Sequence, residues 1–185
     1  WSPDDRDILE KRDKHYGFIN FTSALTADRV FFNSEYHRTS FLSELPRLLK
    51  HFPDYNELDS VKEIELQSSV LHLGLDLKRF DDYPSKKKDT PIILWNHRWE
   101  YDKNPKGFFR LLNTLAENGH EFKLVILGEN FSESPHEFQE NIKTLGDKIL
   151  HVGYEESFKE YAHWLWKSDI LPVTSIQDFF GASIM

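Results

Sequence analysis

The sequence contains no cysteine, and methionine occurs only once among its 185 residues. The lack of cysteine excludes disulfide bonds and thiolate ligands for a metal. No run of about 18 apolar residues occurs, so the sequence predicts no membrane-spanning helix and no membrane partner. The first residues also lack the basic, apolar and small-residue order of an export signal. Together, these absences predict a cytoplasmic protein.

Metal-binding patterns are scarce as well. The nine histidines form no H-E-x-x-H motif and no pair that shares one helix face. The segment 5–7 (DRD) has the D-x-D form of a metal-binding carboxylate pair, but it lies at a predicted helix start and not after a strand. We interpret these carboxylates as capping and solvated residues. The sequence therefore predicts no metal site.

The charge balance limits the partners that the chain could bind. The formal net charge of −8 argues against binding polyanions over a broad surface, although it is compatible with a local cationic pocket. Hydrophobic residues make up 39% of the sequence, which is enough to build a packed core. We therefore expect a folded protein rather than a disordered chain.

The chain predicts two α/β parts joined by a polar stretch. Residues 1–80 predict helices and short strands, with an interruption near Pro46 in the helix over 35–52. Residues 81–90 are charged and contain a proline, so they predict a linker. Residues 91–185 alternate short apolar strands with helices, which predicts a parallel sheet covered on both faces.

In the second part, strands are predicted over 91–95, 122–127, 149–152 and 170–173. Ligands of such sheets bind beyond the carboxyl ends of the strands. After the first strand, Arg98 and Lys103 flank a loop that leads into a helix capped by Asn104. Two cations beside free amide groups form a good receptor for a diphosphate. The alternative is an exposed loop whose cations pair with Glu100 and Asp102.

The last predicted strand is followed by Asp178, Phe179, Phe180 and Gly181. The two adjacent phenylalanines are expected to pack inward or to line a pocket. Gly181 permits close approach of a ligand to the backbone. Asp178 is able to accept hydrogen bonds from sugar hydroxyls or, alternatively, to cap the following helix.

Several segments resemble, in the same order, motifs of the retaining GT-B glycosyltransferases that use nucleotide sugars. The segment 27–34 (ADRVFFNS) resembles a strand near the end of that group's acceptor domain. The segment 73–80 (LGLDLKRF) is similar to the N-G-V-D-x-x-R-F crossover signature, with leucine in place of asparagine. The segment 178–181 (DFFG) is similar to the E-x-F-G opening of a two-carboxylate motif, with aspartate in place of glutamate.

A more specific resemblance covers the chain from about residue 16 to its end. The segment 94–105 (LWNHRWEYDKNP) is similar to the W-x-H-R-W-E-x-D-K-x-P stretch of the tRNA-queuosine mannosyltransferases. The segments 127–131 and 149–154 resemble that family too. The resemblance implies a GT-B enzyme that transfers mannose from GDP-mannose to queuosine in tRNA, without a cofactor or a divalent metal.

The resemblance also implies domains and site residues. Residues 1–80 would end the acceptor-side Rossmann-like domain, and 91–185 would form a truncated Rossmann-like donor domain. Asp178 would contact the sugar as the catalytic-site carboxylate. The residues implied to bind the donor are Arg98, Lys103, Gly153, Tyr154, Phe179, Phe180 and Gly181.

Three alternatives keep the same fold class. The acceptor could be a lipid or a polysaccharide, the protein could be an epimerase with other acid and base residues, or it could be a non-catalytic nucleotide-binding module. Because the chain begins at Trp1 and ends in an apolar segment, we expect an inactive internal piece of a longer enzyme. The sequence predicts no particular oligomeric state.

Overall fold

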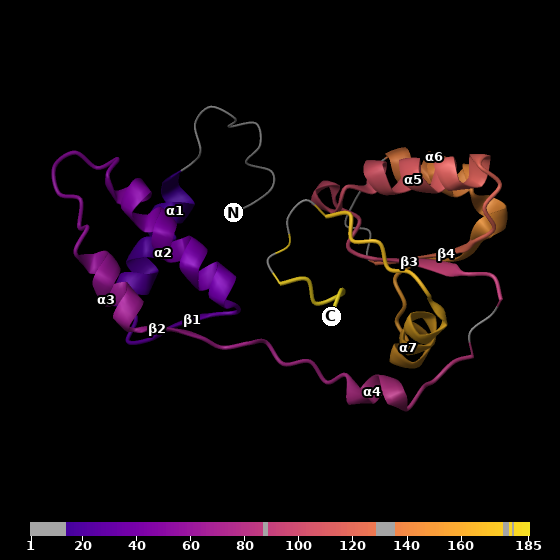
Figure 1. Cartoon of the computed structure of the whole chain (residues 1–185), viewed down its shortest axis with the longest axis horizontal. Coiled ribbons are helices and arrows are strands. Elements are labelled where there is room, and N and C mark those ends of the chain that lie inside the picture. The colour runs from indigo at the N-terminus through magenta and orange to yellow at the C-terminus, as the bar shows by residue number, and fades with distance from the viewer. Residues whose placement is uncertain (1–13, 87–88, 129–135, 176–177, 179) are drawn as a thin grey trace. The chain divides into compact units, whose positions relative to one another are not determined.

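The computed structural model describes residues 14–86, 89–128, 136–175, 178 and 180–185. The chain divides into two compact units, Trp1–Leu75 and Asp76–Met185 (Figure 1). The division falls before the predicted linker 81–90, because the short helix α4 (Lys78–Asp81) packs on helix α7 (Phe158–Lys167) of the second unit. The Phe80 ring lies 5.0 Å from that of Phe158, and the indole of Trp166 donates to the Phe80 carbonyl at 2.7 Å.

The first unit packs three helices beside a two-stranded parallel sheet. Its elements are α1 (Lys14–Thr26), β1 (Val30–Phe32), α2 (Glu35–Leu49), α3 (Ser60–Leu66) and β2 (Ser68–Val70). The expected interruption at Pro46 is wrong, because α2 continues through this residue. Leu45 and Leu49 on either side of the proline are buried in the helical core. Burial of this apolar face outweighs the one backbone hydrogen bond that proline removes.

The second unit contains a three-stranded parallel sheet. The strands β3 (Ile92–Asn96), β4 (Lys123–Leu127) and β5 (Ile149–Gly153) are adjacent in this order. Helices α5 (Pro105–Glu117) and α6 (His136–Thr144) lie on one face of the sheet and α7 on the other (Figure 1). Two short 3₁₀ helices, η2 (Tyr101–Lys103) and η3 (Gly146–Lys148), complete the unit. The predicted parallel sheet covered on both faces is therefore confirmed.

Alternate strand residues form the two cores of this unit. Trp95 packs with Phe108 and Phe138 on the α5–α6 face, whereas Leu94 contributes to the core that contacts Trp164 of α7. Trp164 thus packs against the sheet. Within the described residues, no helix is long and apolar enough to cross a membrane.

The predicted strand over 170–173 is reduced to one isolated bridge, between Ile93 and Ile170. The amide of Leu94 donates to the carbonyl of Ile170 at 2.8 Å. Pro172 lacks the N–H that would continue the ladder. The chain nevertheless runs along the β3 edge, which brings Thr174 next to Lys103 at the carboxyl end of the sheet.

Candidate functional site

A pocket of about 540 Å³ lies at the carboxyl ends of the strands in the second unit. This is the sheet edge at which α/β proteins bind their ligands. Its walls come from the carboxyl ends of β3 and β4 with the segments that follow β3, β4 and β5, from α7, and from Asp178 and residues 181–183. The residues that line it are Asn96, His97, Arg98, Lys103, Leu127, Gly128, Tyr154, Glu155, Glu156, Phe158, Tyr161, Asp178, Gly181, Ala182 and Ser183.

Lys103 is placed by the junction between η2 and α5. Asn104 adopts a left-handed conformation, and its side chain accepts a hydrogen bond from the Gly107 amide at 3.1 Å. Pro105 occupies the first turn of the helix, where its missing N–H has no cost. The Lys103 side chain is only 9% exposed, so this cation is held inside the pocket wall.

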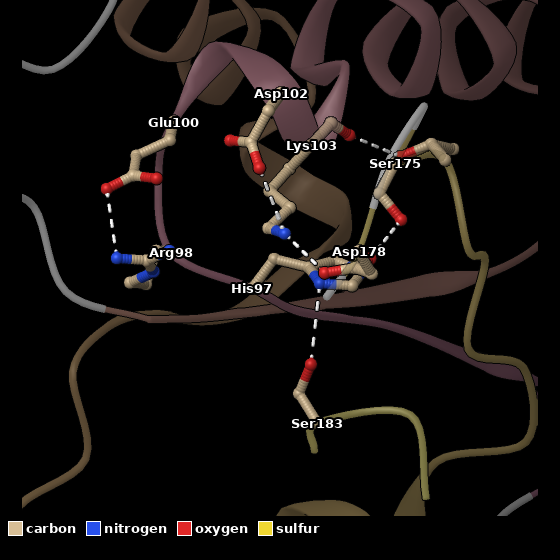
Figure 2. Close-up of polar contacts among 9 residues, drawn as sticks. His97, Arg98, Glu100, Asp102, Lys103, Ser175, Asp178 and Ser183 are labelled. Carbon is tan, nitrogen blue, oxygen red and sulfur yellow. Dashed lines mark hydrogen bonds and ion pairs between the residues drawn. The ribbon is translucent and has the colours of Figure 1, made fainter. Parts of the chain in front are cut away.

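Two carboxylates neutralise Lys103 (Figure 2). Its Nζ lies 2.5 Å from Asp178 Oδ1 and 3.1 Å from Asp102 Oδ2. Burial alone would lower the pKa of Lys103, but the hydrogen bonds and charges of Asp178 and Asp102 outweigh burial and raise its pKa above the ordinary value. Lys103 therefore stays charged although it is buried.

Asp178 lies beyond the last strand of the sheet in the sequence, and its ion pair with Lys103 connects it to η2. Burial would raise the pKa of its carboxyl, but the hydrogen bonds from Lys103 and Ser175, together with nearby positive charge, lower the pKa below its ordinary value. The Ser175 hydroxyl donates to Asp178 Oδ2, and the Thr174 hydroxyl donates to the Lys103 carbonyl at 2.8 Å. Asp178 thus holds an ion pair in the pocket wall, where sugar hydroxyls could reach it as well.

Arg98 differs from Lys103 in its exposure. Its side chain is 60% exposed, and its guanidinium lies 3.3 Å from the Glu100 carboxylate. This is the pairing that the alternative interpretation of the loop expected. An exposed pair of this kind is weak, so Arg98 remains available to a ligand at little cost.

His97 is a pocket residue that the sequence analysis did not single out. Its side chain is buried, lies edge-on to the Trp95 ring at 5.0 Å, and places Nδ1 3.5 Å from the Ser183 hydroxyl. Burial is the main cause that lowers the pKa of His97; Lys103 acts in the same direction, while Asp178 opposes it. The ring is therefore mainly neutral at neutral pH. Two signals in the sequence could have identified it: its position at the end of an apolar strand, and the histidine of the W-x-H-R-W-E-x-D-K-x-P stretch.

Two further residues fix this edge of the sheet. The Asn96 amide donates to the Tyr161 hydroxyl at 2.9 Å and to the Ser183 carbonyl at 3.2 Å, and so connects β3 to α7 and to the last segment. Gly128 has φ +118°, and a Cβ at this position would lie 1.9 Å from the His97 carbonyl oxygen. Only glycine permits this close approach of the two strand ends.

The structure brings most of the predicted site residues together. Arg98, Lys103, Tyr154, Asp178 and Gly181 all line the pocket, and Tyr154 is 65% exposed.

The remaining predicted residues lie elsewhere. Gly153 ends β5 beside Tyr154, and Phe180 is half-buried, but neither lines the pocket. Phe179 falls outside the described residues. Among the described residues, no three histidine, aspartate or glutamate side chains gather in an arrangement that could hold a metal ion.

Comparison with known proteins relates this chain to one family of enzymes. Residues 5–75 match the family model described as the N-terminal region of tRNA-queuosine alpha-mannosyltransferase. The chain is 34% identical to the tRNA-queuosine alpha-mannosyltransferase of Drosophila melanogaster, in a match that covers 96% of this chain and 49% of that protein. The chain thus spans about half the length of this relative.

Several solved structures have a similar fold. The apo structure of OtsA matches with a TM-score of 0.66 at 13% identity, over 94% of this chain and 44% of that one. A UDP-forming α,α-trehalose-phosphate synthase from Burkholderia xenovorans matches with a TM-score of 0.59 at 16% identity, over 96% and 46% of the two chains. At these identities the likeness shows the fold alone, and it confirms the predicted fold class. The chain therefore has the fold of these structures, and its sequence is similar to the tRNA-queuosine alpha-mannosyltransferases.

Proposed function

We propose that this chain is part of a retaining glycosyltransferase that transfers mannose from GDP-mannose to queuosine in tRNA. The observation that carries this proposal is the 34% identity to the Drosophila enzyme, which extends over 96% of the chain. In this proposal residues 1–80 belong to the acceptor side and 91–185 bind the nucleotide sugar. The acceptor and the homologue also support a cytoplasmic location.

The pocket in the second unit has the chemistry that a nucleotide diphosphate needs. Arg98 and Lys103 both face it, next to the N-terminus of α5. Negative charge develops on the diphosphate as the glycosidic bond breaks, and fixed cations stabilise that charge without reorganising. Lys103 would contribute more strongly than an exposed lysine, because its surroundings exclude water. In this proposal the two cations take the place of a divalent metal.

The opposite wall of the pocket is suited to the nucleoside. Tyr154 presents a largely exposed ring directly after β5, and an aromatic ring stacks well on a planar base. Gly153 precedes it with φ +122°, so the turn at the strand end depends on glycine. We propose that the base lies against Tyr154, with the diphosphate directed toward Arg98 and Lys103.

The acceptor is the most specific element of the proposal. The net charge of −8 is unfavourable for binding an extended RNA surface. A modified base in an anticodon loop, however, can be splayed out and recognised in a small pocket. About half of the relative's length lies outside this chain and would also contribute to RNA binding.

The test is sugar transfer by the full-length protein. It is incubated with GDP-mannose, or with UDP-glucose for comparison, and with tRNA that carries or lacks queuosine. The tRNA is then digested and its nucleosides are weighed. We expect one hexose on queuosine only, with GDP-mannose as donor. Arg98→Ala should reduce the transfer strongly, whereas Arg110→Ala, which removes an exposed arginine of α5, should not. Transfer to a lipid or a polysaccharide, with none to tRNA, would refute the proposed acceptor.

A further inference from the structure

The cation at the centre of the pocket wall is not free to meet a diphosphate. Lys103 is bonded to Asp178 and to Asp102, so this group of three side chains carries one net negative charge. The side chains that line the pocket include two cations, Arg98 and Lys103, against three carboxylates. An incoming diphosphate brings more negative charge to the same place. The negative charge already present therefore opposes the binding of a diphosphate, unless another group on the ligand interacts favourably with one of the carboxylates.

The two carboxylates beside Lys103 differ in their access to the pocket. This difference decides which of them a bound ligand contacts. Asp102 is adjacent to Lys103 in η2, its side chain is 11% exposed, and it does not line the pocket. Asp178 comes from a segment distant in sequence, its side chain is 22% exposed, and it lines the pocket. Asp178 is therefore the carboxylate that a ligand reaches directly.

We propose that Asp178 is a specificity-determining residue that makes the pocket prefer a nucleoside-diphosphate sugar to the nucleoside diphosphate alone. The inference rests on the proposed function, in which this pocket binds a nucleotide sugar. With the diphosphate alone, Asp178 stays on Lys103 and competes with the phosphate oxygens for the ammonium. The hydroxyls of an attached sugar donate to Asp178 in place of Lys103 and Ser175, and they leave the ammonium to the phosphate and Asp102.

This exchange has a consequence for turnover. An ammonium has three donors, and a carboxylate has several acceptor positions, so both groups keep their hydrogen bonds throughout the exchange. Once the sugar has been transferred, the hydroxyls leave with the acceptor. Asp178 then returns to Lys103 and weakens the hold on the nucleoside diphosphate. The same residue thus favours the donor before the reaction and the release of the product after it.

The experiment measures the dissociation constants of GDP and GDP-mannose with the full-length protein by calorimetry. Asp178→Asn keeps the size of the side chain and removes its charge. We expect it to bind GDP more tightly than the wild type, and its preference for GDP-mannose over GDP to fall about tenfold, the effect of one charged hydrogen bond. Asp102→Asn should change both affinities by the same factor, because Asp102 stays with Lys103 in both states.

Two further variants make the result specific. Asp178→Glu keeps the charge and should retain the preference for GDP-mannose over GDP. It thereby controls for a loss of preference caused by misfolding rather than by the lost charge. Asp147→Asn removes an exposed carboxylate in η3, before β5 and thus at the other end of the strands, and should change neither affinity. An unchanged preference in Asp178→Asn, with both ligands still bound by the wild type, would overturn this inference alone. Failure of the wild type to bind either ligand would overturn the proposed donor as well.

Discussion

Replacing Lys103 with alanine should separate the two effects of this residue, on the fold and on the donor. The substitution leaves Asp102 and Asp178, with side chains 11% and 22% exposed, facing each other without their common cation. Breaking a buried ion pair by removing one partner costs about 3–5 kcal/mol. We expect the lower end, about 3 kcal/mol, because Asp178 is exposed enough to regain some water.

Arg98→Ala is the matched comparison. This arginine is 60% exposed, and among the described residues its ion-pair partner is the carboxylate of Glu100. Exposed pairs contribute about 0.2–1 kcal/mol, so the expected loss of stability is below about 1 kcal/mol. For GDP binding, however, each substitution removes a cation that attracts the diphosphate, and Lys103→Ala also leaves the charges of Asp102 and Asp178 uncompensated. Each should weaken that affinity by about 1.5–3 kcal/mol.

The measurements are urea unfolding, followed by tryptophan fluorescence, and calorimetric titration with GDP, both on the full-length protein. The double variant Lys103→Ala with Asp178→Asn should recover part of the lost stability, because it leaves one buried carboxylate in place of two. Equal losses of stability in the two single variants would refute the buried ion-pair cluster. Unchanged GDP affinity in both would remove Arg98 and Lys103 from the donor site.

Three other outcomes follow from the site. Sugar transfer should survive EDTA, because fixed cations take the place of a metal in the proposal; lost activity that Mg²⁺ or Mn²⁺ restores would contradict this. Burial lowers the pKa of His97 below 6.5, so the unfolded chain takes up the proton first and stability is lost as the pH falls below 6.5. Unfolding is to be measured across that pH range. The loss of stability should be shallower in His97→Gln than in the wild type, whereas His120→Gln, which replaces an exposed histidine, should lose stability as the wild type does. Gly128→Ala should destabilise the fold by about 2 kcal/mol or more, since its Cβ would collide with the His97 carbonyl. Gly119→Ala is the control, because a Cβ at Gly119 meets nothing within 4 Å; it should cost only the backbone strain of about 1 kcal/mol. Equal losses of stability for the two glycine variants in an unfolding titration would show that Gly128 does not closely approach the His97 carbonyl.

The order of elements in the second unit was predictable from the sequence because its strands are short, apolar and separated by helices. The strands predicted over 91–95 and 122–127, for example, correspond to β3 and β4 within one residue at each end. The errors arose where tertiary packing decided the outcome. Pro46 remains inside a helix because the residues around it are buried, and the strand over 170–173 fails to extend because Pro172 lacks a donor. Local propensity does not contain the packing around Pro46, whereas the effect of Pro172 on the strand was readable from the sequence itself.

The candidate site was predictable in its position but not in its electrostatics. Parallel strands bring their carboxyl ends to one edge, so a motif after the first strand and another after the last were expected to meet. The partners of each charge were not predictable in the same way. Lys103 and Asp178 are 75 residues apart in the sequence, and only the folded sheet edge brings them together. The alternative interpretation of the loop paired its cations with Glu100 and Asp102 but kept them exposed, whereas the structure buries Lys103 and adds Asp178 as a partner.

The two carboxylates beside Lys103 connect the stability of the pocket to its selectivity. A buried lysine without partners would lose its proton, because burial lowers its pKa. Asp102 and Asp178 prevent this and keep the cation in the place where, in the proposal, the diphosphate binds. The same carboxylates oppose a second anion, so a pocket stabilised in this way binds phosphate alone weakly. A ligand that combines phosphate with hydroxyl donors satisfies both the lysine and the aspartate, and a nucleotide sugar is such a ligand. The burial of Lys103 therefore supports a donor site that recognises the phosphate and the sugar together.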